Sequence, residues 1–155
     1  GYDAEWWELP HFILMTFCLS EEDRRSVVRR FRVKRSTADA LEMAQALRAR
    51  LPELAQPQRP STLASWLAPF SDAVLVAGWA AAEPTAREQI AHYAARLRDV
   101  QPIVDGNDLK ALGLKPGPAF RRILDRLRAA WLDGEVNSAE EEHELLERLI
   151  AEEVE

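Results

Sequence analysis

Basic side chains surround a break in the helical pattern between Asp105 and Leu124, in the sequence DGNDLKALGLKPGPAFRRIL. Glycines and prolines interrupt the pattern there, and the unpaired backbone N–H groups of a helix that starts after such a turn attract phosphate. Arginines early in that helix oppose its dipole at a cost of about 0.3–1 kcal/mol each, which an anionic partner would reverse. Gly117 would let another backbone come close. The predicted phosphate-binding set is Lys110, Lys115, Gly117, Arg121 and Arg122. The alternative is that exposed arginines cover a helix–turn–helix packing element.

A second cluster of cations lies in RRSVVRRFRVKR, from Arg24 to Arg35, which has seven basic residues in twelve. This segment is a further candidate for contact with an anionic partner. It would equally form a solvated helix face paired with the acids of the preceding turn, Glu21, Glu22 and Asp23. The residues of this candidate patch are Arg29, Arg30, Arg32, Lys34 and Arg35.

Signals of catalysis or metal binding are weak. The chain has no glycine-rich phosphate loop and no HExxH pair, and His11, His92 and His143 lack ligand partners at helical spacing. Asp105 and Asp108 suit helix capping better than acid–base work. We therefore expect no catalytic residue, no metal site and no cofactor in this chain.

Apolar side chains that are chemically distinctive are expected inside the protein. Cys18, the one cysteine in the sequence, lies in the run LPHFILMTFCL and is predicted to be a buried thiol. That run is too short to span a bilayer, so no membrane partner is expected. Trp66, Trp79 and Trp131 lie on apolar faces and are predicted to be core residues. A reducing, cytoplasmic location fits these features.

Charge is distributed unevenly along the 155 residues. The net charge is −6, but the last 17 residues, from Ala139, hold eight glutamates and one arginine. The rest of the chain is close to neutral. A nucleic-acid partner is therefore compatible with the body of the chain although the total is acidic.

The elements that position these residues are predicted to be helices, about seven or eight of them, in an all-α bundle. Asn107 or Asp108 starts a short helix, Leu109 and Leu112 form its inner face, and Gly113 ends it. Pro118 begins the next helix and Gly134 ends it. The result is a helix–hairpin–helix-like element near the C-terminus.

Other signals complete the helical pattern. Ser138 and Glu141 form a capping box for the last helix. The segment AVLVAGWAAA is apolar all round and is expected at the centre of the fold. The proline-rich LAQPQRPST favours a division into a helical body segment, 1–56, and a helical core and tail domain, 57–155, although one continuous domain is the alternative.

The hairpin resembles the C-terminal part of the bacterial tRNA nucleotidyltransferase/poly(A) polymerase family, the class that includes CCA-adding enzymes. The similarity covers about 45 residues. It is carried by Gly106, Asp108, Leu109, Leu112-Gly113-Leu114, Lys115-Pro116-Gly117-Pro118, Ile123-Leu124, Leu132-Asp133-Gly134-Glu135 and the stretch from Ser138 to Glu142. Leu19 to Ser36 is more weakly similar to the body helices of that family.

This resemblance implies a role in a larger enzyme. Family members have an N-terminal catalytic head whose paired aspartates hold Mg²⁺, and the head transfers CMP or AMP from CTP or ATP to the 3′ end of tRNA. Helical body and tail regions hold the tRNA by its acceptor and T arms. The chain is accordingly expected to be a body-and-tail fragment without the head, with tRNA and its own head as partners. The resemblance leaves open whether the parent adds CCA, CC, A or poly(A).

Two other functions remain compatible with the residues. One is a helical protein-interaction module, such as a homodimer that uses the acidic last helix or the aromatic N-terminus. The other is a DNA-binding helix–hairpin–helix domain, which shares the same phosphate chemistry.

Overall fold

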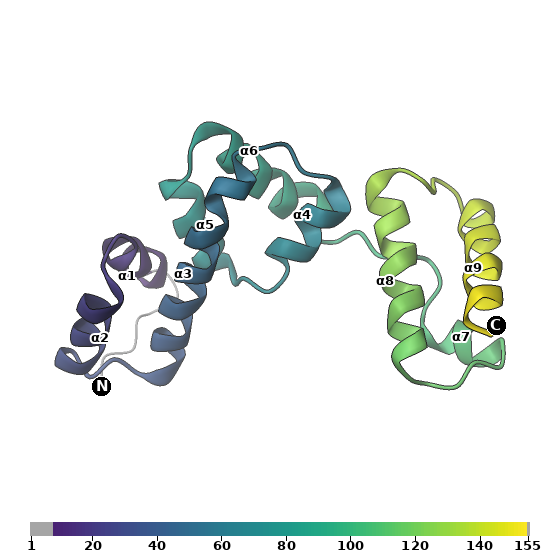
Figure 1. The fold of residues 1–155 in the computed structure, drawn as a ribbon, viewed down its shortest axis with the longest axis horizontal. Helices are drawn as coiled ribbons and strands as arrows, with labels where there is room; N and C mark the ends of the chain where they lie inside the picture. Colours follow the sequence, from purple (N-terminus) through teal and green to yellow (C-terminus); the bar gives the residue numbers. More distant parts are fainter. Residues whose placement is uncertain (1–7, 155) are drawn as a thin grey trace. The chain divides into compact units, whose positions relative to one another are not determined.

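The structure, a computed structural model, describes residues 8–154, with side chains described as far as Glu152. Every regular element in this part of the chain is helical, which confirms the all-α prediction (Figure 1). There are nine α-helices, near the seven or eight expected, and one π-helical turn, Tyr93–Leu97. The α-helices are α1 Leu9–Thr16, α2 Glu21–Arg30, α3 Arg35–Leu54, α4 Pro60–Leu67, α5 Asp72–Ala81, α6 Pro84–His92, α7 Gly106–Ala111, α8 Pro118–Asp133 and α9 Ala139–Val154.

The chain forms two compact units. Of the described residues, unit 1 contains 8–58 and 65–95, and unit 2 contains 59–64 and 96–154. The division proposed from the sequence, after residue 56, stays a prediction.

In unit 1, α5 packs against α1, α3 and α6, as expected of its apolar sequence. Gly78 allows a close approach between α5 and α3, because a Cβ there would lie 2.3 Å from Leu47 Cδ2. The helix is not fully enclosed, however. Val76 is exposed, and so is Trp79, which we expected in the core. The Arg87 guanidinium lies 5.0 Å from the Trp79 ring and covers one face of it.

In unit 2, α8 packs against α7 and α9 around one apolar core. Its central side chains are Leu109, Ile123, Leu127, Ala130 and Leu146. The first turn of α4 is tied to this unit, since the Ser61 N–H and hydroxyl donate to Asp133 at 2.9 and 2.7 Å. Asp133 thus caps a helix 72 residues away in sequence.

The predicted helix ends near the C-terminus are confirmed with one change. Pro118 begins α8, and Gly134 ends it with a left-handed φ of 72°. Ser138 caps α9 by accepting from the Glu141 N–H at 3.2 Å. The Glu141 carboxylate, however, accepts from the Asn137 N–H at 2.7 Å, one residue before the expected donor.

The described residues contain no single helix long and apolar enough to cross a bilayer; α4 and α5 meet that test only when taken together as a bent pair.

Candidate nucleic-acid interface

The first helix of the hairpin is held by a capping box. Asp105 is the N-cap, and its carboxylate accepts from the backbone N–H groups of Asn107 at 2.6 Å and Asp108 at 3.1 Å. The Asp108 carboxylate accepts in return from the Asp105 N–H at 2.8 Å. These backbone hydrogen bonds to Asn107 and Asp108 keep the pKa of Asp105 below its ordinary value of 3.8. Both aspartates are therefore capping residues, as the sequence predicted.

The turn after α7 is a Schellman motif built on glycine. The Leu114 N–H donates to the Leu109 carbonyl, the Gly113 N–H donates to the Lys110 carbonyl, and Gly113 has a φ of 87°. A residue with a side chain would be strained in this left-handed conformation. The turn itself therefore explains why glycine occupies position 113, one of the positions that carry the family resemblance. Leu109 is buried, but Leu112, expected beside it on the inner face, is 51% exposed.

The second helix begins at Pro118, with Gly117 as its N-cap in an extended conformation. Proline has no N–H, and the Phe120 N–H donates to the Gly117 carbonyl at 3.1 Å. Fewer free amides therefore face this end of α8 than the sequence suggested. Any phosphate site here depends mainly on side chains.

Arg121 and Arg122 occupy the fourth and fifth positions of α8, just beyond its first turn. The dipole penalty inferred from the sequence is accordingly smaller, because this effect fades within the first turn. The Arg121 side chain is 88% exposed and has Asp125 as an ion-pair partner at 3.8 Å. Such an exposed, long pair contributes little and leaves the guanidinium available to a ligand.

All five predicted site residues of the hairpin are exposed and belong to one α7–turn–α8 element. Lys110 lies in the last turn of α7, Lys115 in the connection, and Gly117 at the cap of α8. The Lys110 charge contributes to the lowered pKa of Asp105, so that carboxylate offsets part of the positive field. The hairpin therefore presents cations to solvent on both sides of its turn.

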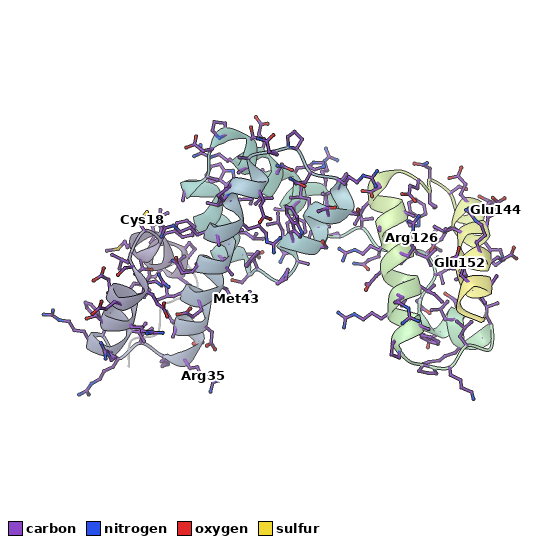
Figure 2. The ribbon with its side chains drawn as sticks, in the orientation of Figure 1. Cys18, Arg35, Met43, Arg126, Glu144 and Glu152 are labelled. Carbon is purple, nitrogen blue, oxygen red and sulfur yellow. The ribbon has the colours of Figure 1, made fainter. Side chains whose placement is uncertain are left out.

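The second basic patch lies in unit 1, at the end of α2 and the start of α3. Arg29, Arg30, Arg32, Lys34 and Arg35 are all exposed, and Figure 2 labels Arg35 at the beginning of α3. The alternative prediction was that this patch pairs with the acids at the start of α2. Glu21 does form an ion pair, but with Arg25, which is not one of the five patch residues. Arg35 has its partner, Asp39, on α3 at 3.9 Å.

Sequence reasoning missed the role of Glu142, which is 1% exposed on α9. Its carboxylate accepts from the backbone N–H groups of Ile103 at 3.0 Å and Val104 at 2.9 Å, and from Trp131 Nε1 at 2.8 Å. These bonds fix the segment that leads into the Asp105 cap and hence into the hairpin. The signal was in the spacing, because Glu142 lies three and four residues before Leu145 and Leu146 on the inner face.

The cysteine, tryptophan and histidine side chains agree only in part with the positions predicted for them. Cys18 is exposed, so the prediction of a buried thiol is wrong. Trp131 is half-buried and bonded to Glu142, while His11, His92 and His143 are exposed. In residues 8–154 no group of three His, Cys, Asp or Glu side chains is placed to hold a metal ion.

Comparison with known proteins finds a partial match to a tRNA nucleotidyltransferase. Over 92 residues, 59% of the chain, the sequence is 35% identical to the A-adding tRNA nucleotidyltransferase of Geobacter sulfurreducens. The chain covers 10% of that protein's length. No family model matches the chain, and no solved structure matches it. The match supports, for part of the chain, the relationship to tRNA nucleotidyltransferases that the hairpin residues indicated.

Proposed function

We propose that the chain is a tRNA-holding part of a tRNA nucleotidyltransferase/poly(A) polymerase, acting in the cytoplasm. The α7–α8 hairpin grips the sugar–phosphate backbone of the acceptor and T arms. A catalytic head in another part of the protein, supplied with Mg²⁺ and CTP or ATP, extends the 3′ end of the tRNA. The name of the relative favours addition of A among the four activities considered.

The observation that carries this proposal is the exposure of the cations on both sides of one glycine- and proline-built turn. Lysine and arginine side chains that stay in water can meet phosphates without breaking buried contacts. Contacts of this kind read the shape of double-stranded RNA and place a distant end, and they do not read its sequence. The hairpin would therefore act as a clamp that sets the distance to the active site.

The test is tRNA binding as a function of salt. In Arg121→Glu/Arg122→Glu, we expect weaker binding and a salt dependence reduced by about two phosphate contacts, since each lost contact lowers the slope by about one. Fluorescence anisotropy with labelled tRNA measures both quantities. Arg148→Glu, an exposed reversal on α9, is the control for net charge, although its change of two charge units is half that of the double variant.

Three results would contradict the proposal. Equal losses in the hairpin variant and the Arg148 control would reduce the effect to net charge. Tighter binding of duplex DNA than of tRNA would favour the DNA-binding alternative. A concentration-dependent dimer in ultracentrifugation, with no tRNA binding at low salt, would favour the interaction module.

A further inference from the structure

The corner that follows α2 places an arginine where the other helices of this type have glycine. The Val33 N–H donates to the Val28 carbonyl and the Arg32 N–H to the Arg29 carbonyl, which makes a Schellman motif with Arg32 at the left-handed position. Its φ is 49°. Gly113 and Gly134 occupy the same position after α7 and α8. A strained backbone at a residue that fills no core space suggests a use for its side chain.

Phe31 stands at this corner between Arg30 and Arg32 and is 58% exposed. A single exposed apolar side chain is ordinary on a protein surface. Phe31 differs through its setting, because its sequence neighbours on both sides are exposed arginines. An aromatic face among guanidinium groups matches a nucleic-acid strand, in which flat bases alternate with phosphates.

The charges of the corner are available to such a strand. Among the described residues, the ion pairs recorded around the corner use Arg25 and Arg35, and none joins an acid to Arg29, Arg30 or Arg32. Proteins bind unpaired nucleotides by stacking bases on aromatic rings and by meeting the backbone with cations. A duplex keeps the faces of its bases hidden, so phosphate contacts alone would give Phe31 no role.

We propose that Phe31 is a stacking platform for an unpaired base of RNA, with Arg29, Arg30 and Arg32 contacting the adjoining phosphates. The assignment to RNA rests on the function proposed above. The stacking site itself belongs to unit 1 and uses no residue of the hairpin. The predicted ligand is therefore a looped or single-stranded nucleotide, in contrast to the double-stranded arms assigned to α7 and α8.

The experiment measures binding of a labelled, unstructured eight-nucleotide RNA to the full chain by fluorescence anisotropy. Phe31→Leu keeps an apolar side chain but removes the aromatic face, and we expect it to weaken binding about 5- to 150-fold, as does loss of one stacked base. Phe31→Tyr keeps the face and should bind within about twofold of the parent. Met15→Ala, at an 80% exposed apolar site of the same unit, is the control and should change nothing.

The result that overturns the proposal is equal binding by the parent and Phe31→Leu. Another is loss of self-association in Phe31→Leu with RNA binding unchanged, because the corner would then contact a second copy. Binding of DNA of the same sequence as tightly as RNA would overturn the assignment to RNA. Arg121→Glu/Arg122→Glu should bind the short RNA as tightly as the parent does. If Phe31→Leu weakens binding of the short RNA as expected, but Arg121→Glu/Arg122→Glu binds tRNA as tightly as the parent, only the hairpin clamp is rejected.

Discussion

Glu142 is a carboxylate withdrawn from water and satisfied by three N–H donors of its own unit. A buried charge is tolerated only when such donors replace its hydration. The donors come from the segment before α7 and from α8, so one side chain of α9 joins three parts of unit 2. At the scale of single residues, this is the contact that connects the core of the unit to the hairpin.

Glu142→Gln is therefore expected to destabilise unit 2. The amide keeps one acceptor oxygen but turns its own N–H₂ group toward N–H donors, and each donor left unsatisfied costs about 1–3 kcal/mol. Urea unfolding followed by circular dichroism should show a lower midpoint for part of the helical signal. Glu144→Gln, at an exposed position of the same helix, should stay within about 0.5 kcal/mol of the parent. Equal midpoints for the two variants would exclude the role assigned to Glu142.

Single residues were the level at which sequence reasoning was least reliable. Cys18, Trp79 and Leu112 each belong to an apolar pattern, yet they are exposed, because the pattern gives a helix face and not the partner that covers it. Glu142 was overlooked for the opposite reason. The helical period places Glu142 on the inner face of α9, but its charged side chain led us to expect it on the surface.

At the scale of elements, the two glycines of the hairpin, Gly113 and Gly117, differ in what their backbone conformation requires. Gly113 has a left-handed φ, whereas Gly117 is extended and a Cβ on it would meet only the Lys115 carbonyl oxygen at 3.9 Å. The fold therefore requires glycine at position 113 but not at position 117. A requirement for glycine at 117 would come from a ligand.

Alanine substitutions separate these reasons. Gly113→Ala should lower the stability of unit 2 by about 1–2 kcal/mol, the cost of a left-handed side chain. Gly117→Ala should unfold like the parent but bind tRNA more weakly, since the new methyl group keeps the RNA backbone away. Urea unfolding and anisotropy on the same preparations measure both. Unchanged tRNA affinity in Gly117→Ala would remove Gly117 from the site.

Elements were predictable where the chain contains strong local signals. Gly113 ends α7, and Pro118 and Gly134 bound α8, through capping and backbone preference, and those three ends are confirmed. The start of α7 was predicted at Asn107 or Asp108, but the helix begins at Gly106 because Asp105 is its N-cap. The number of backbone N–H groups left without an acceptor at the N-terminus of α8 was not predictable from such local signals. It depended on whether Phe120 bonded back to Gly117, which is a matter of three-dimensional geometry.

At the scale of the whole molecule, charge is the main property. The acidic residues of α9, of which Figure 2 labels Glu144 and Glu152, belong to the same unit as the cationic hairpin. Their field opposes the approach of RNA and is screened by salt over about 8–10 Å. The net charge of −6 is thus the sum of a strongly acidic last helix and regions rich in basic residues.

Neutralising exposed glutamates of α9 should strengthen tRNA binding. In Glu144→Gln/Glu147→Gln/Glu152→Gln, we expect tighter binding at low ionic strength and a difference that shrinks as salt rises. The corresponding triple change to aspartate keeps the charge and serves as control. An affinity gain that persists at high salt, or that also occurs with aspartate, would show that repulsion by α9 is not the cause.

The hydrogen bond from Trp131 to Glu142 also gives this protein an intrinsic fluorescent probe. Of the five tryptophans, Trp131 alone falls within the residue ranges of unit 2. Replacing the other four with phenylalanine would leave one indole whose emission follows the carboxylate beside it. Opening of the segment that leads into the hairpin could then be watched in real time, without attaching a dye.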